Sequence, residues 1–248
     1  MSRRTVLVTG ASQGIGAEIA VAFAGDGYDV AVSSTRLDKL PPVLSRIEAA
    51  GARAVAVQLD VRSQESIDQA MSAAIGGLGR IDVLINNAAM ALKRAALDIT
   101  PAEWDAVMDT DLAGAFFMTQ RMGRHLVAER RPGCVISIAS THGLVGLEDR
   151  LAYGVAKAGV MHMTRMLAYE WAGHGIRVNA IAPGRVNTPS REASLSQPGF
   201  REKMLSRVPL KRFAEPGEVA AAARYLASPA AEYITGQTLV LDGGLTIY

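Results

Sequence analysis

Short runs of β-branched residues alternate with longer, alanine-rich stretches of helical period along almost the whole 248-residue chain. This alternation is typical of an α/β protein whose parallel strands are covered by helices on both faces. The strands are expected at residues 5–9, 29–33, 54–58, 83–86, 134–138, 177–181 and 238–241. The helices are expected at residues 14–26, 37–50, 63–76, 101–129, 151–173 and 216–227. We therefore predict one doubly wound α/β domain, residues 1–248, with a parallel sheet of about seven strands.

The charge of the chain is close to balance, with 26 lysine and arginine residues against 24 aspartate and glutamate residues and a formal net charge of +2. Apolar residues make up 49% of the sequence and charged residues 20%, which supports a large buried core and excludes a disordered chain. There is no basic excess to neutralise the phosphates of a nucleic acid. We therefore predict a globular protein with no nucleic-acid partner.

The cysteine and histidine residues are few and scattered. Cys134 is the single cysteine, so it cannot form a disulfide within the chain, and we expect it to pack as a small apolar residue. The four histidines, His125, His142, His162 and His174, show no metal-ligand spacing. The sequence therefore predicts no metal site.

The first apolar stretch of the chain is short. Residues 5–9 follow Met1 to Arg4 directly, and this stretch is far shorter than a signal peptide or a membrane-spanning segment needs. We therefore expect a cytoplasmic protein with no membrane contact.

One segment interrupts the alternation of strands and helices. Residues 188–212 contain Pro189, Pro198, Gly199 and Pro209 among mixed charges, and they follow the strand expected at 177–181. Open α/β sheets bind ligands beyond the carboxyl ends of their strands. We therefore predict that 188–212 is a lid over a substrate. Its basic residues could meet an acidic partner protein, but interleaved glutamates favour a solvated face.

A glycine-rich turn follows the first strand. Gly10, Gly14 and Gly16 occur in Thr9-Gly10-Ala11-Ser12-Gln13-Gly14-Ile15-Gly16, directly before an alanine-rich helix. Glycine permits a positive φ, close approach of backbone N–H groups to a pyrophosphate, and tight packing of helix on strand. The G-x-x-x-G-x-G spacing differs from the common dinucleotide fingerprint, and a turn that binds nothing could use the same glycines. Its position in the first strand–helix unit favours a dinucleotide site.

The residues after the second and third strands bear on the choice of cofactor. An acidic residue after the second strand would accept hydrogen bonds from a ribose 2′-hydroxyl, but this chain has Ser34, Thr35 and Arg36 there. Hydroxyls and a cation suit a 2′-phosphate, so NADP(H) is favoured and NAD(H) stays open, although Arg36 could simply begin a helix. Asp60, which precedes Val61, could accept an adenine amino group, cap the helix near residue 63, or do both.

Three residues with proton chemistry follow the fifth strand. Ser140 ends that strand, Tyr153 comes 13 residues later, and Lys157 lies four residues beyond Tyr153. On a helix, Tyr153 and Lys157 share one face. An ammonium near a phenol favours the phenolate, which makes tyrosine usable as an acid or base near neutral pH. Standing alone, the pair could equally be a buried tyrosine and a solvated lysine.

These motifs do not stand alone. The chain also has Asn86-Asn87-Ala88 after the fourth strand and Pro183-Gly184-Arg185-Val186-Asn187-Thr188 after the sixth. Together with the glycine turn and Tyr153-Gly154-Val155-Ala156-Lys157, they resemble the short-chain dehydrogenase/reductase family over nearly the whole length. The resemblance implies a Rossmann-type NAD(P)-binding fold, hydride transfer between nicotinamide C4 and a ketone or secondary alcohol, and a homotetramer.

The resemblance also implies a role for each site residue. Tyr153 would exchange a proton with the carbonyl oxygen, Ser140 would hydrogen-bond that oxygen, and Lys157 would assist Tyr153 and hold the nicotinamide ribose. The predicted catalytic residues are Ser140, Tyr153, Lys157 and Asp111. The predicted cofactor contacts are Gly10, Ser12, Gln13, Gly14, Ile15, Gly16, Ser34, Thr35, Arg36, Asp60, Val61, Asn87, Tyr153, Lys157, Pro183, Gly184, Val186 and Thr188. The predicted substrate contacts are Ser140, His142, Tyr153 and Arg185.

Two positions depart from the family pattern. Asp111 stands where the family usually has an asparagine that orders a water chain behind the lysine, and an ionised carboxylate cannot donate a hydrogen bond. We expect Asp111 to accept from a water, with activity retained and the pH profile shifted. Ala89 stands where the pattern has glycine, which disfavours a positive φ at that residue.

The motifs leave the substrate open. Length and layout most resemble the 3-oxoacyl-[acyl-carrier-protein] reductase branch, and the mixed apolar and basic residues 90–96 favour a thioester substrate. A sugar, polyol or other small-alcohol dehydrogenase of the same family is the alternative, and it would need several convergent polar groups. A nucleotide-binding protein without turnover has only Asp111 in its favour. His142, two residues beyond Ser140, could bind a polar substrate group or be an ordinary loop histidine.

Overall fold

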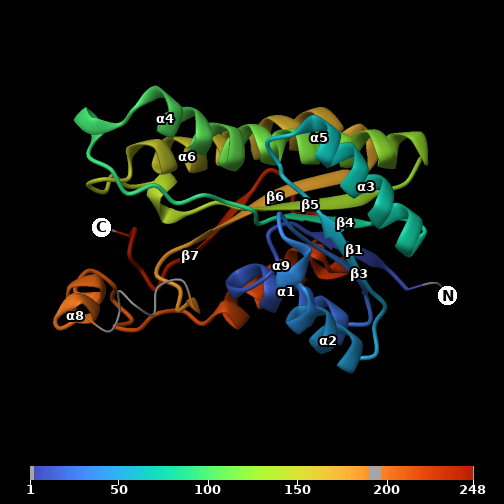
Figure 1. The fold of residues 1–248 in the computed structure, drawn as a ribbon, viewed down its shortest axis with the longest axis horizontal. Helices are drawn as coiled ribbons and strands as arrows, with labels where there is room; N and C mark the ends of the chain where they lie inside the picture. Colours follow the sequence, from blue (N-terminus) through green and yellow to red (C-terminus); the bar gives the residue numbers. More distant parts are fainter. Residues whose placement is uncertain (1–2, 190–196, 248) are drawn as a thin grey trace.

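In the computed structural model, which describes residues 3–189 and 197–247, seven strands lie parallel in one sheet (Figure 1). The strand order is β3-β2-β1-β4-β5-β6-β7, so the chain winds outward from β1 in one direction and then from β4 in the other. This confirms the predicted Rossmann-type fold. The strands are β1 (Thr5–Val8), β2 (Asp29–Ser34), β3 (Ala54–Gln58), β4 (Val83–Asn86), β5 (Gly133–Ile138), β6 (Ile176–Pro183) and β7 (Thr238–Leu241).

Helices cover both faces of the sheet (Figure 1). α3, α4, α5 and α6 lie on one face, and α1, α2 and α9 lie on the other, while α8 lies near one end of the molecule. None of the helices in the described part of the chain is both long and apolar enough to cross a membrane. Their bounds are α1 (Gly14–Gly25), α2 (Pro41–Ala49), α3 (Gln64–Leu78), α4 (Pro101–Met108), α5 (Gly114–Ala128), α6 (Leu151–Trp171), α8 (Phe200–Leu205) and α9 (Pro216–Ala227).

The first strand illustrates how the sheet separates two apolar cores. Val6 and Val8 belong to the core that also contains Phe23 of α1 and Val219 of α9, whereas Leu7 belongs to the core on the α3, α5 and α6 side. All three β1 side chains are fully buried, as a parallel strand covered on both faces requires. Each contributes about 1.5–3 kcal/mol by leaving water.

The structure corrects the expected helices in three places. The stretch predicted at 37–50 begins as a 3₁₀ turn (Leu37–Lys39), and α2 starts only at Pro41, because proline suits the first helical turn. The stretch predicted at 101–129 is divided by a π-helical turn (Asp109–Ala113) between α4 and α5. The short helix α8 within 188–212 was not predicted. Helical period alone does not reveal a π turn, since the apolar pattern continues on both sides of it.

The strand ends set the position of the site. β1 pairs with β2 on one side and with β4 on the other, so the connections that follow β1 and β4 depart in opposite directions and leave a crevice between them. The glycine turn follows β1, and Ser140 comes two residues after the end of β5. Motifs far apart in the sequence therefore meet at the carboxyl edge of the sheet.

Candidate active site

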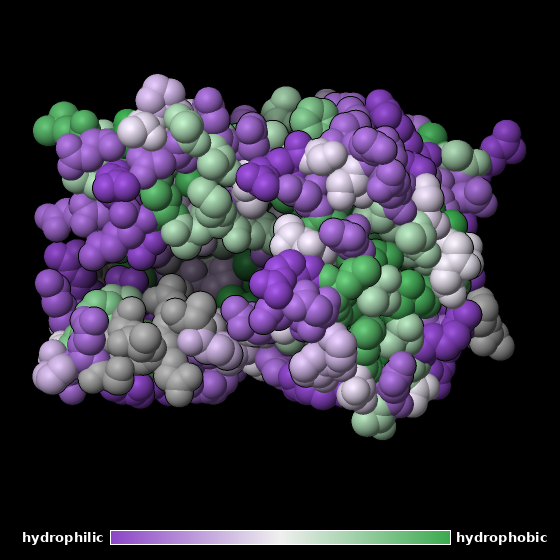
Figure 2. All heavy atoms as spheres, in the orientation of Figure 1, coloured by the Kyte–Doolittle hydropathy of each residue, from purple (hydrophilic) through white to green (hydrophobic). Residues whose placement is uncertain are grey.

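A cavity of about 1710 Å³ opens at the carboxyl ends of the strands. Figure 2 shows a hollow left of centre, with hydrophilic residues gathered at the left margin of the molecule. Pockets for one small ligand usually measure about 300–1,000 Å³, so this cavity has room for a dinucleotide and a second molecule. The predicted residues that line it are Gly10, Ser12, Gln13, Gly14, Ile15, Ser34, Thr35, Asp60, Val61, Asn87, Ser140, His142, Tyr153, Pro183, Gly184, Arg185, Val186 and Thr188.

Four predicted site residues are not part of this lining. Gly16, Lys157 and Asp111 are buried behind it, and Arg36 is exposed beside Ser34 and Thr35. Lys157 and Asp111 can therefore act on the cavity only through the residues in front of them.

The glycine turn has the geometry of a phosphate cradle. Gly10 and Gly14 have φ values of +62° and +60°, which side chains disfavour. A Cβ on Gly10 would lie 2.8 Å from Ala88 Cα, and a Cβ on Gly16 would lie 2.7 Å from the Gly10 carbonyl oxygen and collide with the Asn87 side chain. α1 begins at Gly14 with no side-chain cap, so backbone N–H groups at its start are available to an anion. The residues present therefore fit a dinucleotide pyrophosphate.

Asn87 fastens the end of β4 to this turn. Its side-chain amide donates to the carbonyl oxygens of Thr9 and Gly10, at 3.0 and 2.9 Å. In return, Thr9 Oγ1 accepts hydrogen bonds from the backbone N–H groups of Asn87 and Ala88, both at 3.0 Å. The Asn87 side chain is therefore engaged within the protein, and the cofactor contact predicted for this residue concerns its backbone.

A carboxylate is held at the wall of the cavity beyond β3. Asp60 accepts hydrogen bonds from Arg62 Nε at 3.0 Å and Nη2 at 2.7 Å, and this guanidinium lowers the pKa of Asp60 below its ordinary value. The prediction that Asp60 caps the following helix was wrong, because Ser63 Oγ accepts from the N–H of Ser66 and caps α3. Val61, the next residue, also lines the cavity.

The residues after β2 include one ion pair that the sequence analysis did not anticipate. Arg36 donates from Nε to Asp38 Oδ1 at 3.1 Å and from Nη2 to Asp38 Oδ2 at 2.7 Å. Its backbone N–H donates to Ser34 Oγ at 3.2 Å. The buried hydroxyl of Ser33, which also lines the cavity, has no hydrogen-bond partner among the described residues. The end of the cavity beside β2 therefore has serine hydroxyls, with the Arg36 guanidinium, paired with Asp38, next to them.

Ser140, His142 and Tyr153 form one polar cluster on the cavity wall. Ser140 Oγ lies 3.0 Å from His142 Nδ1 and accepts the backbone N–H of His142 at 3.2 Å, which also caps the 3₁₀ turn Thr141–Gly143. The His142 ring packs edge-on against Tyr153, with ring centroids 5.7 Å apart. His142 therefore contacts both Ser140 and Tyr153 at the cavity wall.

Lys157 lies behind the Tyr153 ring in a buried ion pair. Its Nζ is 5.5 Å from the ring centroid, donates to the Ile138 carbonyl oxygen at 3.0 Å, and lies 3.2 Å from Asp111 Oδ2. The Lys157 and Asp111 side chains are only 4% and 0% exposed. Asp111 Oδ1 accepts the Met90 N–H at 2.6 Å. Burial raises the pKa of Asp111 above its ordinary value, while Lys157 and the Met90 N–H act in the opposite direction.

The direct contact revises the expectation for Asp111. We expected it to accept from a water behind the lysine, but its two oxygens face Lys157 and the backbone of Met90. The π turn Asp109–Ala113 carries the Asp111 side chain into the interior, where α4, α5 and α6 meet. π turns of this kind occur often at functional sites.

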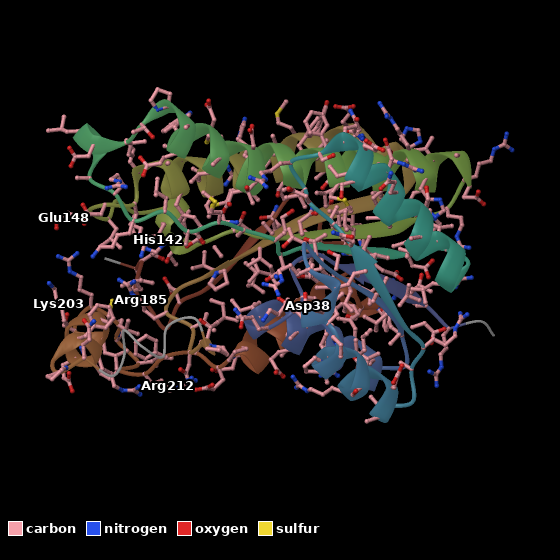
Figure 3. All side chains as sticks on the ribbon, in the orientation of Figure 1. Asp38, His142, Glu148, Arg185, Lys203 and Arg212 are labelled. Carbon is pink, nitrogen blue, oxygen red and sulfur yellow. The ribbon has the colours of Figure 1, made fainter. Side chains whose placement is uncertain are left out.

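The far end of the cavity is formed by two segments: the first was not assigned to the site by the sequence analysis, and the second belongs to the predicted lid. Residues 146–150 line one side, and residues 197, 200, 203, 204, 206 and 207 line the other. In Figure 3, Glu148 and Lys203 lie on opposite sides at the left of the view, with His142 and Arg185 nearer the sheet. The position of residues 146–150 between Ser140 and Tyr153 is a signal that could have placed them here.

The predicted lid is only partly described. Residues 190–196 lie outside the described residues, whereas Thr188, Pro189 and the six residues 197, 200, 203, 204, 206 and 207 line the cavity. Arg212, at the end of the segment, is not part of the lining and pairs with Glu218 at 2.7 Å.

Comparison with known proteins identifies the family. A family model described as enoyl-(acyl carrier protein) reductase matches residues 10–246. A 3-oxoacyl-[acyl-carrier-protein] reductase from Synechocystis is 38% identical over 253 residues, which cover 100% of this chain and 99% of that protein. The chain belongs to the short-chain dehydrogenase/reductase family. This short-chain dehydrogenase/reductase is therefore an NAD(P)-dependent oxidoreductase that acts on a CH–OH or ketone group.

Relatives of this short-chain dehydrogenase/reductase differ in the substrates that their names state. 3beta-hydroxysteroid dehydrogenase 1 from Eggerthella lenta is 38% identical over 247 residues, which cover 99% of this chain and 94% of that protein. The solved structure of a variant actinorhodin polyketide ketoreductase with NADPH is similar to this fold, with a TM-score of 0.93 and 34% identity. That match covers 99% of this chain and 98% of the other. Family membership alone therefore leaves the substrate open.

Proposed function

We propose that this enzyme transfers a hydride between C4 of NADP(H) and a ketone or secondary alcohol, with Tyr153 as the proton donor or acceptor. The observation that carries the proposal is the Ser140, His142 and Tyr153 cluster on the wall of a cavity that also contains the glycine turn. When bound, the nicotinamide supplies or accepts the hydride. The protein supplies position, a proton and stabilisation of the developing charge.

Each residue of the cluster has a separate proposed role. In the reduction direction, the Tyr153 hydroxyl gives its proton to the substrate oxygen, and in oxidation it takes that proton back. Ser140 donates a hydrogen bond to the same oxygen, and His142 orients the serine hydroxyl at 3.0 Å. Lys157 lies behind the ring and places a positive charge 5.5 Å from the ring centroid. Because Lys157 does not line the cavity, this electrostatic role has more support than its predicted contact with the nicotinamide ribose.

The preference for NADP(H) is supported by the end of β2. Ser34, Thr35 and Arg36 replace the acidic residue that would accept a ribose 2′-hydroxyl. The structurally similar polyketide ketoreductase contains NADPH. NAD(H) is the alternative, and separate titrations with the two cofactors decide between them.

A 3-oxoacyl thioester is the proposed substrate. Full-length similarity to a 3-oxoacyl-[acyl-carrier-protein] reductase supports it, and the cavity is lined by apolar groups together with basic groups. The apolar lining residues are Met90, Ala91, Leu147, Phe200 and Met204, and the basic ones include Lys93, Lys203 and Arg207. A polar sugar or polyol is the second candidate, because Glu148, Asp149 and Arg185 also line the cavity.

The decisive experiment uses the purified protein with NADPH or NADH and a panel of acetoacetyl thioesters, simple ketones and oxidised sugars. Tyr153→Phe should lower turnover by roughly 10²–10⁴-fold, because it removes the exchangeable proton, and retained NADPH binding shows that the variant is folded. Tyr169→Phe is the matched control, since Tyr169 is an exposed tyrosine on the same helix. Full turnover by Tyr153→Phe would contradict the proposal. Tight NADPH binding without turnover across the panel would favour the nucleotide-binding alternative.

A further inference from the structure

The exposed ion pair between Arg36 and Asp38 has no evident task in holding the fold. Both residues belong to the turn between β2 and α2, and their side chains are 65% and 59% exposed. The pair links residues two positions apart, so it joins no two elements of the structure. Exposed pairs of this kind contribute little to stability.

The pair nevertheless determines which donors Arg36 can offer a ligand. Nε and Nη2 of the guanidinium form a fork on the two carboxylate oxygens of Asp38, at 3.1 and 2.7 Å. The same two-pronged geometry is the one with which arginine binds a phosphate. Arg36 follows Ser34 and Thr35, which line the cavity, so this guanidinium is a cation beside the position proposed for the 2′-phosphate. Its interaction with Asp38 also raises the pKa of Arg36 and lowers that of Asp38, so both groups stay charged.

We propose that Asp38 is a specificity-determining residue: its carboxylate competes with the 2′-phosphate of NADP(H) for the Arg36 guanidinium and thereby reduces discrimination against NAD(H). This inference rests on the proposed use of NADP(H). A 2′-phosphate carries about −1.5 to −2 charges, so Asp38 both occupies its partner and repels it. A ribose 2′-hydroxyl is uncharged and needs no guanidinium. Removing the Asp38 charge therefore strengthens the binding of NADP(H) much more than that of NAD(H).

Figure 3 labels Asp38 beside the layer that contains α1 and α2, away from Glu148 and Lys203 at the other end of the cavity. The predicted effect is therefore on the cofactor and not on the substrate. Lys39, the next residue, is the other cation of this turn and stays in place in every variant described below.

The test measures binding of NADPH and NADH to the purified protein by the fluorescence of the reduced nicotinamide, with no substrate present. Asp38→Asn keeps the size of the side chain and removes its charge. The dissociation constant for NADPH should fall by roughly threefold to tenfold, and that for NADH should change by less than about twofold, as expected for one exposed charge interaction. Glu18→Gln is the matched control, because Glu18 forms a similar fork with Arg46, at 2.8 Å, and neither residue lines the cavity.

A double-mutant cycle with Arg36→Ala separates competition from general repulsion. If Asp38 acts by occupying Arg36, Asp38→Asn should have a much smaller effect in the Arg36→Ala background. An equal effect in both backgrounds would overturn the proposed competition, as would an unchanged ratio of NADPH to NADH affinity in Asp38→Asn. The proposed use of NADP(H) is tested separately: it is wrong if Arg36→Ala leaves NADPH binding unchanged.

Discussion

Asp111 brings a carboxylate within 3.2 Å of Lys157 Nζ, where water reaches neither side chain. At low local dielectric such a charge acts strongly on its neighbours. It forms an ion pair with the Lys157 ammonium, which lies 5.5 Å from the centroid of the Tyr153 ring. The same residue holds the Met90 backbone at the cavity wall, so one carboxylate affects both the proton chemistry and the shape of the site. Asp111 acts through Lys157 and Met90, so we treat it as a positioning residue.

The predicted consequence is a shift in pH dependence. Burial raises the pKa of Asp111, so protonation of this carboxyl adds to the pH dependence of alcohol oxidation, and Asp111→Asn should remove that contribution from the profile of kcat/KM. The measurement is the pH profile of oxidation for both proteins, with NADPH binding as a check on folding. Asp109→Asn, on the exposed side of the same π turn, should leave the profile unchanged. A profile of Asp111→Asn with the same shape as that of the unmodified protein would contradict this role.

At the scale of single residues, the sequence analysis identified the side chains that carry the chemistry but not the ion pairs around them. Ser140 and Tyr153 were identified because their residue types carry the chemistry, and the structure brings both to one cavity. The Arg36–Asp38 pair depends on a local 3₁₀ turn, and the Asp111–Lys157 pair depends on a π turn. Neither turn has a distinct signature in residue spacing, which explains why both pairs were missed.

Helix α9 shows what local signals do predict at the scale of an element. A helix was expected at residues 216–227, and α9 occupies this range with a reciprocal capping box at its start: the Glu215 side chain accepts the N–H of residue 218, and Glu218 accepts the N–H of Glu215 at 2.8 Å. Glu218 also accepts two hydrogen bonds from Arg212, at 2.7 and 2.8 Å. Arg212 lowers the pKa of Glu218 from 4.5 to about 2.

This lowered pKa gives a stability prediction with a defined pH range. Because the folded pKa lies below the ordinary value, the carboxylate stabilises the fold above pH 4.5, and this contribution is lost as the pH falls towards about 2. Glu218→Ala should therefore reduce the free energy of unfolding by about 1 kcal/mol at pH 7, with a smaller difference at acid pH. Denaturant unfolding at several pH values measures this. Glu48→Ala, an exposed glutamate on α2, is the control, and a difference that grows at acid pH would refute the assignment.

Elements governed by local signals were predicted closely, and those governed by tertiary contacts were not. α4 begins at Pro101, where the sequence analysis expected a helix to start, and the Thr100 and Glu103 capping box that opens it has all of its groups within four residues. The division between α4 and α5 depends instead on the burial of Asp111 against α6. α8 likewise forms in a segment whose prolines and glycine predict a loop.

At the scale of the whole molecule, the order of strands and helices was readable because hydrophobic period is a repeated signal along the entire chain. The strand order in the sheet follows from right-handed connections between parallel strands and from the reversal after β3. What the pattern does not encode is the surface that a second copy would cover. α6 carries apolar side chains that this chain leaves exposed: Val155 is 40%, Met166 59% and Tyr169 91% exposed.

Val155, Met166 and Tyr169 lie on one helical face, because Met166 and Tyr169 come eleven and fourteen positions after Val155. Phe117 on neighbouring α5 is 39% exposed as well. We predict that this face is buried against a symmetry mate in a homotetramer. Sedimentation equilibrium at micromolar concentration should give four chains for the unmodified protein, and Met166→Glu combined with Tyr169→Glu should give a smaller assembly because it buries two charges. Leu97→Glu, at a fully exposed leucine outside α5 and α6, should leave the tetramer intact. A monomeric unmodified protein, or a tetramer that survives the double substitution, would show that this face is not the interface.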